Sequence, residues 1–591
     1  MLLLRLQKPK YRNALFLLLW VGIGFALRFM NLAGKPPWTD EFATLVFSLG
    51  NTFKSVKLDQ IITANDLLQP LIVNPQHGVG QAINSLIHED HHPPIYFALA
   101  NLWGRWFSAP GQLVSLGVMR SLPALCGVFS IPAIYYLARL TFSSNLIAQL
   151  SALMMAVSPY GIFISQEARH YTMAVLFVIA SLGCLVMAAK NLVNRRSLPW
   201  RISLLWVGIN TLGMGIHYFF ILTLAAQILV LIYLGWQYRK NWLNIGKFLT
   251  QWRGILIAVI GTMAGSLVWL QLWLYSRDDQ MTEWLRNSDR SFLDFINPIF
   301  QSVATWVTMV YLLPIEGPNL GVMIFFIVIM VSSLLGWLLP LLYRGIKQGL
   351  SNLETNQGIT LIGGFTIASV GIFFAIAYLL GMDITRGARY NFVYFPAVIV
   401  LVGVSLSYFW RQSTTINFPI PQPFNWQNIK LQYQGRNAVV IVLSLGLLSG
   451  LTVATNLGYQ KYYRPDILIP IIQANSTQPI IIATTHNTLV QTGEMMGIAW
   501  EWQRSYNTPP PRYLLAHQQQ RECQGDNCAA SKTLSQQIEK LPQPLDLWLI
   551  NFQAPVKLSN CALTKVDAQG VNWVNGYGYK LYKCNQNSRF K

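Results

Sequence analysis

Two acidic side chains, Asp40 and Glu41, follow a Pro-Pro-Trp turn just beyond the first apolar segment of the chain. A carboxylate at a membrane surface is partly desolvated, and desolvation raises its basicity, so this pair is a candidate general base. The same residues also suit the start of a helix, with Thr39 or Asp40 as the cap and the acids in the first turn. The sequence leaves both interpretations open.

A second polar run, Asp90-His91-His92, directly precedes two prolines. Two prolines favour an extended approach followed by a helix start, so we expect these side chains near a helix N-terminus, which favours anionic ligands. Aspartate and histidine also bind metals, and Asp40, Asp90 and His92 would be the ligands of a divalent cation such as Mg²⁺ or Mn²⁺. Adjacent residues seldom chelate one ion together, and the sequence leaves the metal unassigned.

Two further clusters combine arginine with ring side chains at the ends of apolar segments. The guanidinium fork suits a carboxylate or a phosphate, so substrate binding is one interpretation. For the cluster at 167–170 the other interpretation is that its charges merely mark the membrane interface, and for the cluster at 386–390 it is a salt bridge within the protein, to Asp383 or Glu167. The first cluster holds Glu167, Arg169 and His170, and the second holds Arg386, Arg389 and Tyr390.

Membrane spans are the elements that must position these residues. Of the 591 residues, 53% are hydrophobic and only 11% are charged, and the mean hydropathy is +0.37. Repeated apolar runs of about 20 residues match the thickness of a bilayer and predict a mainly α, polytopic helical bundle. The net charge of +20 lies mostly in short loops between these runs, so we expect no nucleic-acid partner.

The basic loops orient the predicted spans. The first span, at about residues 14–27, follows basic residues, which places the N-terminus in the cytoplasm and the next loop outside. Continuing in this way gives about eleven spans, with a helix at 95–107 in the outer interface. All the polar clusters then face outward. Arg386 and Arg389 run against the usual charge bias there, which indicates an anionic partner such as a lipid phosphate.

Residues 458–591 change character, because the long apolar runs stop. Short β-rich pieces at 480–484, 545–550 and 579–582 alternate with helix-compatible stretches and predict a small α/β domain. Four cysteines suit two disulfides outside the cytoplasm, with the pairing left open, and their spacing is unlike that of zinc sites. These are Cys523, Cys528, Cys561 and Cys584.

Two parts follow from this pattern. We predict a membrane module over residues 1–457, with a large external loop at 31–118, and an extracytoplasmic domain over 458–591. The expected location is the plasma membrane, with multiple spans.

In their order and sidedness, the polar motifs resemble those of the GT-C glycosyltransferases. The similarity covers roughly residues 10–400 and is to family 39, the branch of the protein O-mannosyltransferases and of the bacterial aminoarabinose transferases of lipid A. The motifs that carry it are Asp40-Glu41, Asp90-His91-His92-Pro93-Pro94, Arg120-Ser121-Leu122-Pro123-Ala124, Ser158-Pro159, Ser165-Gln166-Glu167-Ala168-Arg169 and Arg389-Tyr390.

This resemblance implies an enzyme that moves a sugar, with inversion, from a polyprenyl-phosphate donor to an acceptor on the extracytoplasmic face. Asp40 matches the base, with Glu41 and Asp90 as further catalytic candidates. Arg389 is a candidate contact for the leaving phosphate, whose developing charge a cation stabilises. The remaining substrate-binding candidates are His91, His92, Glu167, Arg169, His170, Arg386 and Tyr390.

Other functions remain possible on the same pattern. A polytopic transporter or flippase would share the spans, and a polymerase or ligase of lipid-linked glycans would share the donor. The apolar runs largely lack the charges near span centres that transporters use, which favours sugar transfer. The sugar, the acceptor (a lipid, a glycan or a protein), the role of the C-terminal domain and the oligomeric state are not determined by the sequence.

Overall fold

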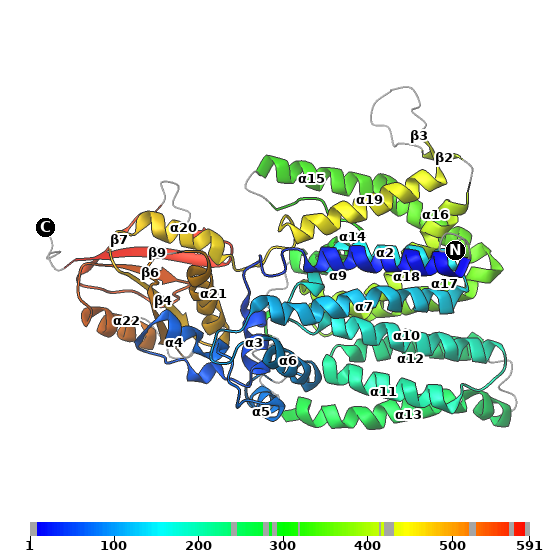
Figure 1. Cartoon of the computed structure of the whole chain (residues 1–591), viewed down its shortest axis with the longest axis horizontal. Helices are drawn as coiled ribbons and strands as arrows, with labels where there is room; N and C mark the ends of the chain where they lie inside the picture. Colours follow the sequence, from blue (N-terminus) through cyan, green and yellow to red (C-terminus); the bar gives the residue numbers. More distant parts are fainter. Residues whose placement is uncertain are drawn as a thin grey trace, which may run out of the picture. The chain divides into compact units, whose positions relative to one another are not determined.

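The computed structural model describes residues 9–585, except for 91, 238–244, 276–282, 287–291, 317–319, 413–414, 419–430, 507, 519–527 and 567–571. The chain forms two compact units (Figure 1). The membrane unit contains residues 1–32, 91–96 and 120–459. The α/β unit contains residues 33–90, 97–119 and 460–591.

The membrane unit consists of long helices joined by short connections. Its elements are α2 (Pro9–Phe29), α7 (Leu116–Phe142), α8 (Asn145–Val157), α9 (Pro159–Ser165), α10 (Tyr171–Val193), α11 (Trp200–Ile216), α12 (Phe220–Gln237), α13 (Ile245–Tyr275), η5 (Glu283–Leu285), α14 (Phe292–Val310), α15 (Leu320–Ser333), the π-helical turn η6 (Leu334–Leu338), α16 (Leu339–Ser351), α17 (Leu353–Leu379), η7 (Ile384–Arg386), η8 (Ala388–Val393), α18 (Phe395–Arg411), the hairpin β2 (Thr415–Phe418) and β3 (Leu431–Gln434), and α19 (Gly435–Ala454).

The predicted mainly helical membrane fold is confirmed. Among the described residues, eight helices are long and apolar enough to cross a bilayer, and the bent pair α8 and α9 makes a ninth. The other two of the eleven predicted segments correspond to α11 and α18, which are helices of 17 residues each. The helix expected at 95–107 is also present, as α6 (Pro94–Phe107).

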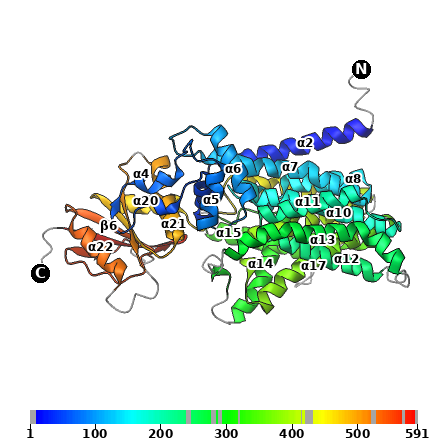
Figure 2. The same cartoon turned by 90° about the horizontal axis from the view of Figure 1, so that it is seen from below.

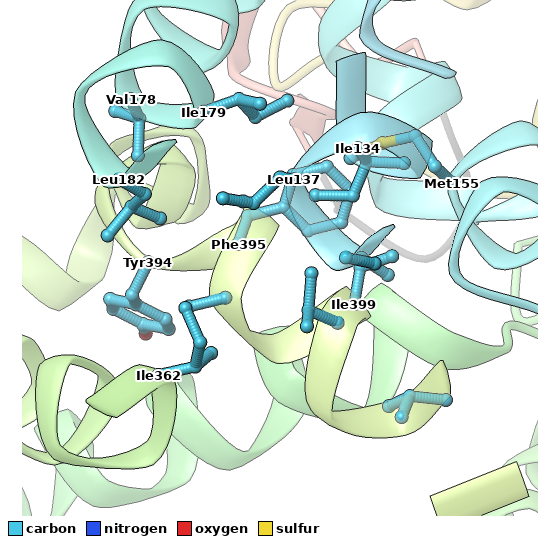
Figure 3. Close-up of a cluster of buried hydrophobic side chains, with 14 of the residues drawn as sticks. Ile134, Leu137, Met155, Val178, Ile179, Leu182, Ile362, Tyr394, Phe395 and Ile399 are labelled. Atoms are coloured by element: carbon cyan, nitrogen blue, oxygen red, sulfur yellow. The ribbon is translucent and has the colours of Figure 1, made fainter. Parts of the chain in front are cut away.

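Apolar side chains from five of these helices form the centre of the membrane unit. Figure 3 shows them packed together, and each is almost fully buried. Around this core, α11 packs on α13 and α12 packs on α17 (Figure 2). The labelled residues are Ile134 and Leu137 of α7, Met155 of α8, Val178, Ile179 and Leu182 of α10, Ile362 of α17, and Phe395 and Ile399 of α18 with the preceding Tyr394.

The chain bends by 54° between α8 and α9, at Ser158-Pro159. Pro159 has no N–H to donate to the carbonyl of Met155 four residues earlier, so that oxygen needs another partner. The fully buried Arg28 of α2 supplies it, donating to Met155 O at 2.8 Å and to Ala156 O at 2.9 Å. The Ser158 hydroxyl accepts from Gly161 N at 3.2 Å and caps α9. The bend brings the end of α9 to the residues that begin α10.

The α/β unit is built on a mixed sheet. Its elements are α3 (Thr39–Ser48), η1 (Phe53–Ser55), β1 (Ile61–Ile62), α4 (Ala64–Leu68), η2 (Gln69–Leu71), α5 (Val79–Glu89), most of α6, α20 (Pro465–Asn475), β4 (Ile480–His486), α21 (Leu489–Ser505), β5 (Arg512–His517), α22 (Ala529–Glu539), β6 (Leu545–Ile550), β7 (Cys561–Thr564), β8 (Trp573–Val574) and β9 (Tyr577–Cys584).

The strand order of this sheet is β1-β5-β4-β6-β9-β7, with β8 paired to β9. The three central strands, β5, β4 and β6, are parallel, and the others join antiparallel. Helix α22 packs on one face, against alternate residues of the central strands, and α21 contacts β4 and β5 (Figure 1). All three strands expected from the sequence are present, because short β-branched and aromatic runs fit the buried pleat of such a sheet.

Disulfides are present in this unit, as the cysteine count predicted. Cys561 and Cys584 lie opposite each other on β7 and β9 and are bonded. Cys528 is also disulfide-bonded. Cys523 lies outside the described residues. Two further cysteines, Cys126 of α7 and Cys184 of α10, are free and buried in the membrane unit.

Most of the first external loop folds together with the C-terminal segment. Helices α3 and α4 pack on α21, and β1 extends the sheet beside β5. The sequence pattern grouped this loop with the membrane spans, because they are its neighbours in the chain. In the structure it completes the α/β unit.

Close packing between α8 and α18 gives a test of the bundle. A Cβ atom on Gly403 would lie 2.9 Å from the backbone N of Ser151, so Gly403→Leu must push the two helices apart. We expect it to destabilise the fold by about 1–3 kcal/mol or more, as overpacking does. Gly208→Leu on α11 is the matched control, since nothing lies within 4 Å of its added Cβ. Thermal unfolding of the detergent-solubilised chain should show a lower midpoint for Gly403→Leu alone. Equal midpoints would contradict this packing.

Candidate active site

Three histidines that are far apart in the sequence meet in the membrane unit. His170 is the N-cap of α10, His217 connects α11 to α12, and His92 lies just before α6. The His170 ring centroid is 4.6 Å from that of His217 and 5.6 Å from that of His92. His170 and His217 are buried, with exposed fractions of 1% and 7%.

Aromatic rings surround these imidazoles. Phe392 lies 4.8 Å from His217 between ring centroids, and Tyr171 lies 5.0 Å from His170. Tyr390 follows further out, with its ring 6.2 Å from that of His217. These rings form a weakly polar wall on one side of the cluster.

Burial sets the charge of the imidazoles. His170 and His217 lie in connections between helices, outside the membrane-spanning segments. Desolvation holds the pKa of both rings well below the usual 6.5, and the neighbouring cations Arg169 and Arg389 lower it further. Both rings are therefore neutral at pH 7, where each can donate and accept a hydrogen bond.

Arg169 is a buried cation within this cluster. Its Nη2 lies 3.3 Å from Nε2 of His92, and its guanidinium lies 5.7 Å from the centre of the Tyr171 ring. A guanidinium can only donate, so Nε2 of His92 is the acceptor and the ring proton sits on Nδ1. Glu167 is also buried, and its carbonyl accepts from the backbone N of Arg169 at 2.7 Å. The predicted cluster at 167–170 thus lies next to His92, one of the residues predicted from the earlier loop.

The two later arginines have different surroundings. The Arg389 guanidinium stacks near Trp284, 5.7 Å from the ring centre, and near Tyr390 at 5.4 Å. Arg386 instead forms ion pairs with Asp383 at 3.5 Å and with Asp294 at 4.0 Å. For Arg386 the intraprotein salt bridge is therefore present, whereas Arg389 lies at the edge of the ring cluster.

The first acidic pair lies in the α/β unit. Asp40 and Glu41 occupy the first turn of α3, whose N-cap is Trp38 without a side-chain hydrogen bond, so neither Thr39 nor Asp40 is the cap. Glu41 is fully buried, and its Oε2 lies 3.9 Å from Nζ of Lys461, which in turn lies 5.6 Å from the centre of the Trp38 ring. Asp40 remains partly exposed.

Asp90 ends α5 in the same unit and is buried, with its backbone N donating to Leu86 O at 3.0 Å. Helix α6 begins at Pro94, so the polar run does precede a helix N-terminus as predicted. His91 lies outside the described residues. In the described part of the chain, no three His, Cys, Asp or Glu side chains are placed to hold a metal ion.

The structure thus gathers the candidates into two sets, one in each unit. His92, Glu167, Arg169, His170, Arg389 and Tyr390 belong to the membrane unit, and Asp40, Glu41 and Asp90 belong to the α/β unit. Sequence reasoning did not name His217 or Lys461 as site residues. His217 had one signal, since it lies at a span end on the same predicted side as His170. Lys461 had none, because it lies 420 positions after Glu41.

Residues 91–269 match the sequence model of a family described as dolichyl-phosphate-mannose-protein mannosyltransferase. This segment contains His92, Arg169, His170 and His217. The match agrees with the predicted resemblance to the protein mannosyltransferases over this segment, which is less than half of the chain. No curated protein sequence matches the chain.

Several solved structures are similar to the chain. ArnT from Cupriavidus metallidurans, bound to undecaprenyl phosphate, is 12% identical over 97% of this chain and 98% of that one, with a TM-score of 0.46. The oligosaccharyltransferase of Archaeoglobus fulgidus in its apo form is 13% identical over 92% of this chain and 70% of that one, with a TM-score of 0.43.

The lowered pKa of the buried imidazoles predicts how stability depends on pH. In the unfolded chain each histidine takes up a proton below pH 6.5, but in the folded chain His170 and His217 do not, so stability is lost as the pH falls below 6.5. Each such group contributes up to about 1.4 kcal/mol per pH unit. We expect His217→Gln to reduce the drop in melting temperature between about pH 7.5 and about pH 5.5. The exposed His88→Gln is the control. If both variants lose as much stability as the wild type, the neutral buried state of His217 is wrong.

Proposed function

We propose that this protein is a glycosyltransferase that moves a sugar from a polyprenyl-phosphate donor to a lipid, glycan or protein acceptor at the extracytoplasmic face of the plasma membrane, with inversion. The observation that carries the proposal is the buried Arg169 beside His92 and the histidine pair, in the segment similar to the mannosyltransferase family. Such a cluster provides positive charge and neutral hydrogen-bonding groups in a desolvated place, which suits a phosphate leaving group.

In this reaction an acceptor hydroxyl oxygen attacks the anomeric carbon as the bond from that carbon to the phosphate oxygen breaks. The polyprenyl phosphate leaves with the bonding electrons, and the hydroxyl proton passes to a carboxylate. One displacement inverts the anomeric centre. We assign the proton to Asp40, because Asp40 is partly exposed whereas Glu41 is fully buried and paired with Lys461.

The leaving phosphate needs cations within reach. Arg389 stands beside Trp284 and Tyr390 with part of its side chain exposed, and Arg169 lies deeper. We assign Arg389 to the phosphate directly and Arg169, with His92 and His170, to the wall that orients it. We keep Asp90, two residues before His92 in the chain, as a further catalytic candidate.

The disulfides support an extracytoplasmic site. Disulfides persist in oxidising compartments and are rare in the cytoplasm. The bonded Cys561 and Cys584 belong to the same compact unit as Asp40, Glu41 and Asp90. The acidic residues are therefore expected on the side of the membrane where the first external loop was predicted.

Removal of the proposed base gives the most direct test. With labelled polyprenyl-phosphate sugar in membranes, we expect Asp40→Asn to slow transfer about 10²–10⁴-fold, as loss of a general base does. Glu539→Gln, an exposed carboxylate in the same unit, is the control and should transfer normally. Equal extraction and melting of the two variants shows that Asp40→Asn folds. Normal transfer by this folded variant would exclude Asp40 as the base, and movement of the donor across vesicles without any transfer by the wild type would favour a flippase.

The sidedness has its own test. In a background with the two free buried cysteines replaced by alanine, single exposed cysteines are labelled in intact cells with a membrane-impermeant maleimide. We expect labelling of Gln76→Cys, Leu380→Cys and Lys540→Cys. We expect Arg196→Cys and Gln348→Cys to be labelled only after the cells are opened. Labelling of the first three on different sides of the membrane would break up the proposed site.

A further inference from the structure

A cavity of about 1630 Å³ lies in the membrane unit, at the opposite end of the bundle from the histidine cluster. Helix α10 connects the two places, since it begins at Tyr171 beside His170 and reaches the cavity at Ala189 to Val193. At 1.5 Å per residue the separation is roughly 30 Å. A molecule in this cavity is therefore not in contact with the proposed active site.

One end of the cavity is cationic. Arg139 of α7, Lys190 of α10 and Arg411 of α18 line it, with Glu354 of α17 as the acidic neighbour. Lys190 and Arg139 donate to the carbonyl oxygens of Leu140 and Ser143, and Arg411 Nη2 donates to Ser144 Oγ at 3.2 Å. Across the described residues, none of the three cations pairs with a carboxylate. The lining thus carries three positive charges against one negative charge.

The rest of the cavity is a long slot with a mostly apolar lining, to which α17 adds the hydroxyl groups of Thr360 and Thr366. Along α17 its lining runs from Glu354 to Ala368, which is about 21 Å at the helical rise. Apolar residues of α10 and α12 form the other walls. A polar end with a long apolar extension has the form of a lipid headgroup and its chain. The volume also exceeds the 300–1,000 Å³ that is usual for small-molecule sites.

The slot is open at the outer surface of the helical bundle. Three of its lining residues, Leu229, Tyr233 and Ile367, have exposed fractions of 47%, 46% and 75%. Beside them, nothing lies within 4 Å of a Cβ atom built on Gly363. Since α12 and α17 are candidate membrane spans, the surroundings at this depth are lipid. The acyl chain of a lipid can therefore enter the slot directly from the bilayer, without passing through water.

We propose that this cavity binds an anionic phospholipid of the cytoplasmic leaflet, with its phosphate among Arg139, Lys190 and Arg411 and one acyl chain along Gly363. Basic pockets between membrane helices on the cytoplasmic side recognise anionic headgroups in this way. The basic loops place this end of the bundle in the cytoplasm, away from the sugar-transfer face. The lipid would fill the space between α10, α12, α17 and α18 at the cytoplasmic end of the bundle, and it would contact all four helices. This inference does not depend on the transfer reaction.

The test measures lipid binding to the purified full chain by native mass spectrometry and thermal shift, with phosphatidylglycerol and phosphatidylcholine as probes. The wild type should bind phosphatidylglycerol at least tenfold more tightly and should melt at a higher temperature with it. Because each cation contributes about fivefold, Lys190→Gln with Arg411→Gln should remove most of this preference.

Two glycine variants on α17 distinguish the effect of filling the slot from the effect of adding a phenylalanine elsewhere on the same helix. Gly363→Phe places a ring in the slot without a clash at its Cβ and should abolish binding of either lipid there. Gly371→Phe is the control, because it lies on α17 outside the cavity lining and its added Cβ also meets nothing within 4 Å. Equal binding of the two lipids by the wild type would overturn the proposal, as would unchanged binding by Gly363→Phe. Binding of undecaprenyl phosphate that is tighter than that of phosphatidylglycerol and is lost in Gly363→Phe but not in Gly371→Phe would overturn the proposal, because it would assign the cavity to the carrier lipid.

Discussion

The membrane unit depends on the bend between α8 and α9. The hydrogen bonds from Arg28 to the carbonyl groups of Met155 and Ala156 stabilise this bend. In the hydrocarbon region each unsatisfied carbonyl costs several kcal/mol, so a helix can be interrupted there only if another group replaces the missing donor. Arg28 does so from a different helix. The interruption at Ser158-Pro159 turns the chain, and α9 then delivers Gln166 to His170 to the point where α10 starts.

A desolvated cationic wall is the chemical result of this arrangement. Arg169 lies buried in contact with His92 and with the face of Tyr171. Burial lowers the pKa of His170 and His217, the neighbouring arginines lower it further, and both rings therefore remain neutral. Under the proposed function, the leaving phosphate would place its negative charge beside the arginines of this wall, where guanidinium groups form charge-assisted hydrogen bonds.

The α/β unit combines two segments that lie on either side of the membrane module in the chain. A parallel sheet with helices buries its strands on both faces, and the C-terminal segment supplies only part of that cover. Helices α3 and α4 from the first external loop pack on α21, and Lys461 reaches the carboxylate of Glu41. The acidic residues are therefore positioned by a folded unit that contains a disulfide, and not by the first external loop alone.

The sequence by itself determined the spans, the three strands and the presence of disulfides, because each leaves a local signal: a run of about 20 apolar residues, a short β-rich run, or a set of cysteines. It also located most of the polar residues that the membrane unit gathers, because charge at the end of an apolar run is conspicuous. Tertiary structure alone decided that His217 joins His170, that Lys461 pairs with Glu41, and that Arg386 is taken up by Asp383 while Arg389 is stacked on rings. These are contacts between segments that are distant in the chain. They are fixed by how the elements pack, and no local pattern in the sequence shows which segments will meet.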